Sequence, residues 1–251
     1  ERWGKMKFGL FGGPQTHISN MGPETAIGYQ DYGKYVVEAE RLGYSSAWLF
    51  EHHFSGFGQP SSTLNLLCYF SGITNTIRLG SAVVVLPWHN PILLAEQIGT
   101  LDVVSNGRYD FGVGRGYRVN EFHGFGIDAQ DAGEIYRESM EIIIRAWMEK
   151  ERWSYKSDRW EFNNIIVEPK PVQKPHPPIW QGAGSEESIR QAARQGYGLL
   201  LDQILSFAEV RERIAIYHEA IEGLGRKFDP NNIGVTRGLM LTHNAKQREA
   251  S

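Results

Sequence analysis

A chain of 251 residues with 41% hydrophobic and 22% charged residues has the composition of a folded globular protein, and its length suits one large α/β domain or two small ones. Its 26 basic and 29 acidic residues give a formal net charge of −3, which argues against a nucleic-acid partner because phosphate binding needs a concentrated basic surface. The single cysteine, Cys68, cannot form an internal disulfide, and no apolar stretch approaches the ~20 residues of a membrane span, so we expect a cytoplasmic protein outside the membrane.

Short apolar segments alternate with segments of helical periodicity along the chain. The predicted strands are residues 7–11, 46–50, 77–85, 108–112, 178–182, 198–202 and 233–241. Asn90 followed by Pro91 is typical of a helix start, and Ser206 and Glu209 have the spacing of a capping box. Regular β/α alternation predicts a parallel sheet with right-handed crossovers. Seven such units in a chain of this length favour a TIM (β/α)₈ barrel, a single domain over residues 1–251.

Two segments depart from this rhythm. Residues 151–178 are rich in Trp, Tyr, Asn and Pro and predict an inserted hairpin at residues 153–162, followed by a Pro-rich connector; insertions of this size often act as lids. The tail, residues 243–251, is too short and polar to supply an eighth strand with its helix. Because a barrel closes only when its last strand pairs with its first, we expect the last β/α unit to be missing from this chain. Alternatively, an N-terminal segment or a partner subunit covers the gap.

The residues that follow the second predicted strand have side chains suited to catalysis. In a TIM barrel the active site lies at the carboxyl ends of the strands, and here strand 46–50 is followed by Glu51, His52 and His53. Strand alternation places His52 on the face of Phe50 and the other two residues on the opposite face. Two histidines that diverge in this way do not easily share a metal ion. His52 is therefore a candidate general base or hydrogen-bond donor, with a purely structural histidine as the alternative.

Glycine-rich turns follow two later strands. Arg115 stands between glycines after strand 108–112, and its guanidinium suits a phosphate. Gly184, Ser185 and Ser188 follow strand 178–182, where exposed amides and hydroxyls at a helix start also suit a phosphate. Tight turns alone could explain these glycines. The turn lacks the third glycine of a dinucleotide fingerprint, and Ser185 lacks the GxSxG context of a serine nucleophile.

Four long motifs in a fixed order resemble the luciferase-like flavin-dependent monooxygenases, and the resemblance covers nearly the whole chain. The motifs are residues 48–54, 78–87, 105–116 and 169–180.

The resemblance implies a role for several positions. His52 matches the family's catalytic histidine near the reactive edge of the flavin. Ala82 and Val83 match a non-prolyl cis peptide under the isoalloxazine ring. Arg115 matches the arginine that binds the FMN phosphate, and the backbone of Tyr117 matches the residue that approaches the ring. Ser185 and Ser188 match phosphate ligands, while Gly184, where some relatives carry an acidic residue, would contribute only backbone.

The resemblance also implies a mechanism and partners. Reduced FMN would react with O₂ to give a C4a-hydroperoxyflavin, which passes one oxygen to a small organic substrate while the other leaves as water. Because the chain lacks a dinucleotide fingerprint, a separate flavin reductase would supply the reduced flavin. We also expect a homodimer. One alternative is an F420-dependent oxidoreductase that transfers hydride on the same barrel. Another is a non-catalytic flavin-binding subunit, against which the presence of both His52 and Arg115 argues.

Overall fold

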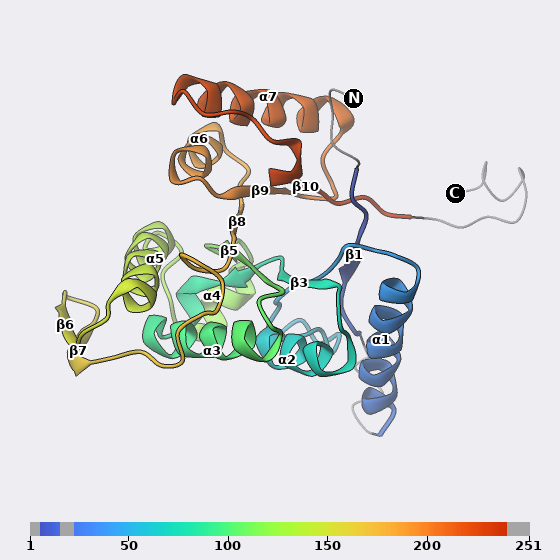
Figure 1. Ribbon diagram of the computed structural model, residues 1–251, viewed down its shortest axis with the longest axis horizontal. Coiled ribbons are helices and arrows are strands. Elements are labelled where there is room, and N and C mark those ends of the chain that lie inside the picture. The colour runs from blue at the N-terminus through green and yellow to red at the C-terminus, as the bar shows by residue number, and fades with distance from the viewer. Residues whose placement is uncertain (1–5, 16–22, 240–251) are drawn as a thin grey trace, which may run out of the picture. The chain divides into compact units, whose positions relative to one another are not determined.

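The chain forms two compact units, residues 1–182 and residues 183–251, each built from alternating strands and helices. The computed structural model describes residues 6–15 and 23–239 (Figure 1). Among the described residues, no helix is both long and apolar enough to cross a membrane.

The first unit contains parallel strands that pair in chain order. The strands are β1 (Gly9–Gly12), β2 (Ser46–Leu49), β3 (Arg78–Ser81), β4 (Val84–Val85), β5 (Tyr109–Gly114) and β8 (Ile179–Gly182). Parallel pairs join β1 to β2, β2 to β3, β3 to β5 and β5 to β8, and the short β4 also pairs with β5. All six residues of β5 are buried, as expected for a strand that has neighbours on both sides and is covered on both faces.

Helices follow these strands and cover them. The helices are α1 (Pro23–Arg41), α2 (Thr63–Ile73), the 3₁₀ turn η2 (Leu86–Trp88), α3 (Pro91–Val104), α4 (Val119–Phe125) and α5 (Ala132–Met148). Within the unit α2 packs against α3, and α3 packs against α5 (Figure 1). The predicted start of α3 is confirmed, because the Asn90 side chain accepts hydrogen bonds from the amides of Ile92 and Leu93. Helix α4 was not predicted.

The third predicted strand, residues 77–85, is interrupted. Strand β3 ends at Ser81, β4 begins at Val84, and the Ala82–Val83 peptide between them is cis. The cis peptide that the resemblance implies is therefore confirmed. The prediction of one unbroken strand over residues 77–85 is wrong.

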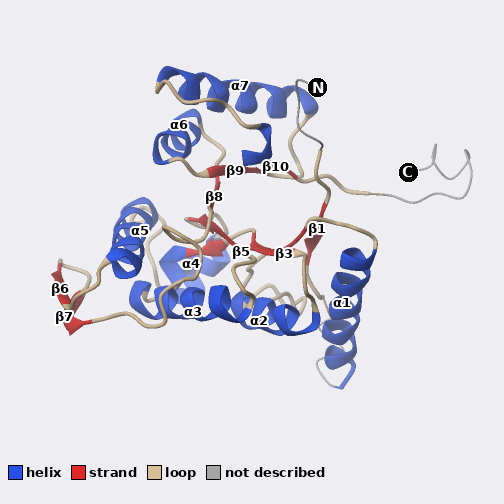
Figure 2. Cartoon of the chain, viewed as in Figure 1, coloured by secondary structure: helices blue, strands red, loops and turns tan. Residues whose placement is uncertain are grey.

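The insertion contains the expected hairpin. Strands β6 (Trp153–Lys156) and β7 (Glu161–Ile165) pair antiparallel and form a two-stranded sheet of their own (Figure 2). The Tyr155 hydroxyl donates to a carboxylate oxygen of Glu138 in α5 over 3.2 Å, so the hairpin is anchored on that helix. Its role as a lid stays a prediction.

The second unit contains two further β/α steps. Its elements are α6 (Glu186–Gln195), β9 (Gly198–Leu201), α7 (Phe207–Gly223), the 3₁₀ turn η3 (Pro230–Asn232) and β10 (Ile233–Val235), with β9 and β10 parallel. The predicted capping box of Ser206 and Glu209 is confirmed. The last strand is shorter than predicted, because residues 236–239 are not strand and residues 240–241 lie outside the described residues. The tail 243–251 lies outside them too, so the missing barrel unit stays a prediction.

A polar network ties together the beginnings of β3 and β5. Arg78 donates to both carboxylate oxygens of Asp110 over 2.7 and 2.9 Å, and also to Gln173 of the Pro-rich connector. Gln173 in turn donates to the buried carboxylate of Asp102 through its backbone and its side-chain amide. Arg108 donates to carbonyl oxygens at the end of α2 and before β3. The amino edge of the strands is thus fixed by ion pairs and charge-assisted hydrogen bonds.

Candidate active site

His52 follows the carboxyl end of β2, and its position is fixed from both sides. Its imidazole ring lies 5.3 Å from the ring of Phe50, so the predicted face is confirmed. The backbone amide of His52 donates to the carbonyl oxygen of Pro60 over 2.9 Å, and the Thr63 hydroxyl donates to the carbonyl oxygen of Phe50 over 2.8 Å. The loop from β2 to α2 is therefore closed back onto the strand end, which leaves the His52 side chain 15% exposed.

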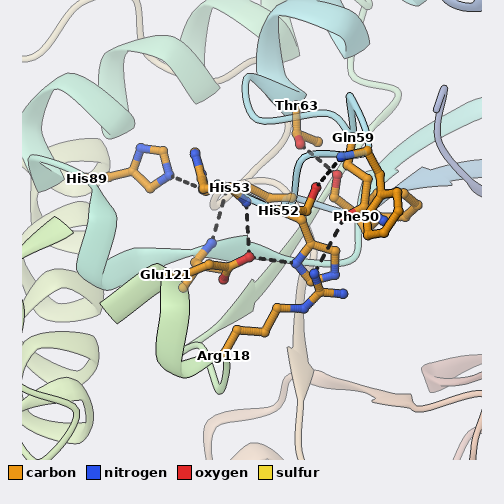
Figure 3. A network of polar contacts seen from close by, with 12 residues as sticks. Phe50, His52, His53, Gln59, Thr63, His89, Arg118 and Glu121 are labelled. Carbon is orange, nitrogen blue, oxygen red and sulfur yellow. Dashed lines mark hydrogen bonds and ion pairs between the residues drawn. The ribbon is translucent and has the colours of Figure 1, made fainter. Parts of the chain in front are cut away.

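A buried carboxylate from α4 holds the His52 ring. Oε1 of Glu121 lies 3.0 Å from Nδ1 of His52 and also accepts the backbone N–H of His53 over 3.0 Å (Figure 3). Glu121 is 1% exposed. Because a carboxylate only accepts hydrogen bonds, this contact assigns the ring proton to Nδ1. Nε2 then carries the lone pair, and it has no hydrogen-bond partner among the described residues.

The surroundings of His52 favour its neutral form. Burial lowers the pKa of the imidazole, and the positive charge of Arg118 lowers it further, while the Glu121 carboxylate raises it; the resulting pKa lies below the ordinary value of 6.5. At neutral pH the ring therefore presents an unprotonated Nε2, which can accept a proton or a hydrogen bond.

A second carboxylate organises the opposite face of the same loop. Oε1 of Glu51 accepts from Nε2 of His53 and Nε2 of His89, each over 2.9 Å, and its other oxygen accepts the backbone N–H of Val85. The two adjacent histidines therefore diverge, as strand alternation predicts. Burial raises the pKa of Glu51, but the hydrogen bonds from the two histidines outweigh this effect and the net pKa is lowered. Glu51 thus stays ionised. Its hydrogen bonds connect the end of β2 with Val85 of β4 and with His89, which precedes α3.

The cis peptide lies in a space that glycines keep open. A Cβ atom at Gly114 would lie 2.6 Å from Cγ2 of Val83, and one at Gly182 would lie 3.4 Å from Cγ1 of the same side chain. A side chain on β5 at this point would therefore displace Val83, which is itself half-buried. Glycine at the end of β5 lets the Ala82–Val83 segment lie against the strand.

The two residues predicted on the turn after β5 are open to solvent. The Arg115 side chain is exposed and has neither a hydrogen bond nor an ion pair among the described residues. Tyr117 is 73% exposed, and its ring lies 6.3 Å from that of His52 in an edge-on arrangement. The turn after β5 therefore carries an exposed guanidinium, unpaired within the described part of the chain, and an exposed aromatic ring beside His52.

The second unit carries the other predicted phosphate ligands. Ser185 is the N-cap of α6, and its hydroxyl accepts the Ser188 amide over 3.3 Å, while the Ser188 hydroxyl accepts the Ser185 amide over 3.2 Å. Ser185 is exposed and Ser188 is half-buried. The guanidinium of Arg213, from α7, approaches Gly184 so closely that a Cβ atom there would lie 3.8 Å from it. A helix N-terminus, two hydroxyls and a cation thus meet within this unit.

Several of these residues could not be found from sequence spacing. Glu121 is 69 positions from His52 and lies in the unpredicted helix α4, and His89 is 38 positions from Glu51. Arg213 was likewise missed. In the part of the chain that the structure describes, no group of three or more His, Cys, Asp or Glu side chains is arranged to hold a metal ion.

Comparisons with known proteins agree on a family. The model of the luciferase-like monooxygenase family matches residues 6–251. The oxygenase component of the flavin-dependent trigonelline monooxygenase of Acinetobacter baylyi is 32% identical over 188 residues, which cover 73% of this chain and 51% of that protein. The chain spans about half the length of the curated relatives it matches, 50% and 51% for two of them.

Solved structures share the fold. The monooxygenase RslO1 from Streptomyces bottropensis is 25% identical with a TM-score of 0.88, over 98% of this chain and 74% of that one. An F420-dependent secondary alcohol dehydrogenase has a TM-score of 0.74 at 17% identity, over 92% of this chain and 68% of that one.

Proposed function

The chain belongs to the luciferase-like monooxygenase family, and from this premise we propose that it acts as an FMN-dependent monooxygenase on a small organic substrate. Reduced FMN would supply the electrons with which O₂ is split, one oxygen atom entering the substrate and the other leaving as water. A separate reductase would deliver the reduced flavin, which is supported by the relative described as an oxygenase component. We expect a homodimer, which sedimentation would test.

The observation that carries this proposal is the His52–Glu121 pair. Glu121 holds Nδ1, so Nε2 of His52 is oriented and unprotonated at neutral pH. In that state His52 can take up a proton released by the substrate or orient a reacting oxygen atom. Because the imidazole is only 15% exposed, this proton transfer would take place largely away from bulk water, whose access would favour loss of the oxidising equivalents as hydrogen peroxide.

The residues around this pair fit a flavin. Arg115 offers an exposed guanidinium that has no partner among the described residues, which suits the FMN phosphate, and the exposed face of Tyr117 suits an aromatic ring system. Gly114 leaves the room that the Val83 side chain of the cis-peptide segment occupies. Within the second unit, Ser185, Ser188 and the backbone of Gly184 also suit a phosphate, with Arg213 as an additional cation.

The test compares wild type with His52→Ala in an assay with reduced FMN, O₂ and candidate substrates. We expect the variant to bind FMN as wild type does, to form no oxygenated product, and to release the oxygen consumed as hydrogen peroxide. Full product formation by His52→Ala would refute the assignment of His52.

The F420 alternative rests on the shared fold alone. It predicts substrate oxidation or reduction that continues without O₂, whereas the proposed reaction stops when O₂ is removed. The non-catalytic alternative predicts flavin binding without either activity.

A further inference from the structure

Arg118 stands beside the candidate base with an almost unused guanidinium. It comes from the turn before α4, and Figure 3 shows its head group next to the His52 ring. Within residues 6–15 and 23–239 its one hydrogen bond is long, 3.5 Å from Nη1 to Oε1 of Gln59, and its guanidinium carbon lies 5.9 Å from the centre of the Tyr117 ring. Among the described residues no carboxylate lies within ion-pair distance of Arg118. Its side chain is nevertheless half-buried.

Two other half-buried arginines of this unit, Arg78 and Arg108, each donate five hydrogen bonds, whereas the half-buried Arg145 pairs with Glu149 and lies over the ring of Trp153. Arg78 uses its donors on both oxygens of Asp110, on two backbone carbonyls and on Gln173. Arg108 donates to four backbone carbonyls and to the Thr74 hydroxyl. A guanidinium has five N–H donors, and withdrawing it from water is unfavourable unless they find partners. Among the described residues Arg118 has no carboxylate partner and only the long hydrogen bond to Gln59, and it lies beside His52.

The nearby carboxylates are already engaged. Oε1 of Glu121 accepts from Nδ1 of His52 and from the amide of His53, and the Glu121 side chain is buried. Glu51 is held by His53 and His89. Neither pairs with Arg118, so the positive charge of Arg118 remains available to a ligand that reaches His52.

We propose that Arg118 binds the acidic group of the substrate, and that the substrate is therefore an organic acid. Its carboxylate would lie against the planar guanidinium, which matches a carboxylate with two parallel hydrogen bonds. Its organic part would extend over the exposed ring of Tyr117 and bring the reacting atom to Nε2 of His52. This inference rests on the proposed function, because it names the substrate class of the same site.

The test measures binding and does not depend on turnover. The probes are benzoate and benzamide, a charged and a neutral molecule of nearly the same shape, together with hexanoate and hexanamide. Each is titrated into the FMN-loaded full chain, and binding is followed by calorimetry. We expect wild type to bind each acid about 10- to 150-fold more tightly than its amide, the range that a charged hydrogen bond gives.

Two variants assign the preference to Arg118. Arg118→Gln should bind the acids only as tightly as the amides, with unchanged affinity for the amides and for FMN, and Arg118→Lys should retain part of the preference. Arg137→Gln, which removes an exposed charge from α5, should behave as wild type. A merely structural role of Arg118 would weaken acids and amides alike.

Three results would overturn the proposal: equal affinity of wild type for acid and amide, no binding of either acid at millimolar concentration, or an acid preference that survives in Arg118→Gln. A loss of FMN affinity in Arg118→Gln would also overturn it, by assigning the residue to the flavin phosphate. An acid preference without any flavin-dependent oxygenation would instead refute the proposed function and leave the acid site standing.

Discussion

The contact between Glu121 and His52 makes a quantitative prediction for Glu121→Gln. The glutamine side chain has nearly the same shape, but it removes the charge from an acceptor that is 1% exposed and bonded to both Nδ1 of His52 and the amide of His53. An amide can also donate to Nδ1, which would move the ring proton to Nε2 and block the candidate base. One hydrogen bond to a charged group contributes about 1.5–3 kcal/mol, so kcat should fall by roughly 10- to 150-fold.

The pH profile separates positioning of His52 from a general loss of structure. In wild type, activity should rise with pH through the pKa of His52, which burial and Arg118 hold below 6.5. Because the Glu121 carboxylate raises that pKa, Glu121→Gln should lower it further and move the acidic limb of kcat/KM to lower pH. Glu141→Gln, at an exposed position of α5, is the matched control and should leave rate and profile unchanged.

The assay is product formation with reduced FMN as a function of pH, with FMN affinity and melting temperature measured on the same samples. A variant that keeps kcat within about threefold of wild type and has an unmoved acidic limb would refute the role of Glu121, since even the weakest charged hydrogen bond should cost more. A large drop in melting temperature with an unmoved limb would make Glu121 structural.

Two further predictions concern the flavin phosphate and acid stability. Arg115→Ala should weaken FMN binding by the ~1.5–3 kcal/mol of a charged hydrogen bond, measured by fluorescence titration, whereas Arg137→Ala should not; unchanged affinity would remove Arg115 from the phosphate site. Burial raises the pKa of Glu40, but N–H groups of residues 75–77 outweigh this and hold it at about 2. Its contribution to stability should thus be full above pH 4.5 and be lost as pH falls towards 2. The difference in unfolding free energy between wild type and Glu40→Gln should shrink over that range, and a constant difference would contradict this account.

The elements of the fold could be predicted because they depend on local patterns. Each of the seven predicted parallel strands has a counterpart among the described residues, although their ends differ by a few residues. The break at Ala82–Val83 could not come from apolar periodicity, since residues 77–85 are continuously apolar enough for one strand; only the family resemblance indicated it. Helix α4 has few apolar residues at helical spacing, so the sequence pattern did not predict it.

In the candidate site, too, some residues could be predicted from the sequence and others could not. The direction of His52 follows from strand alternation, and the position of Arg115 just after a strand follows from the glycine-rich turn in the sequence. The contact of His52 with Glu121 depends on where an unpredicted helix lies. The two residues are 69 positions apart, and no sequence pattern indicates a contact over that separation. The same holds for the bond between His89 and Glu51. Chemistry-bearing residues can thus be named from sequence, but the groups that set their protonation come from tertiary structure.

The network of Arg78, Asp110, Gln173 and Asp102 has a consequence for how this protein can change. It fixes the beginnings of the strands, whereas His52, Arg115 and Arg118 lie on turns after the strands end. Substitutions in those turns can therefore alter what is bound without loosening the parts of the chain that keep it folded. In a library of random variants, inactive but soluble proteins should carry changes after the strand ends, and insoluble ones should carry changes in the network. A lineage could then exchange substrates while retaining its framework.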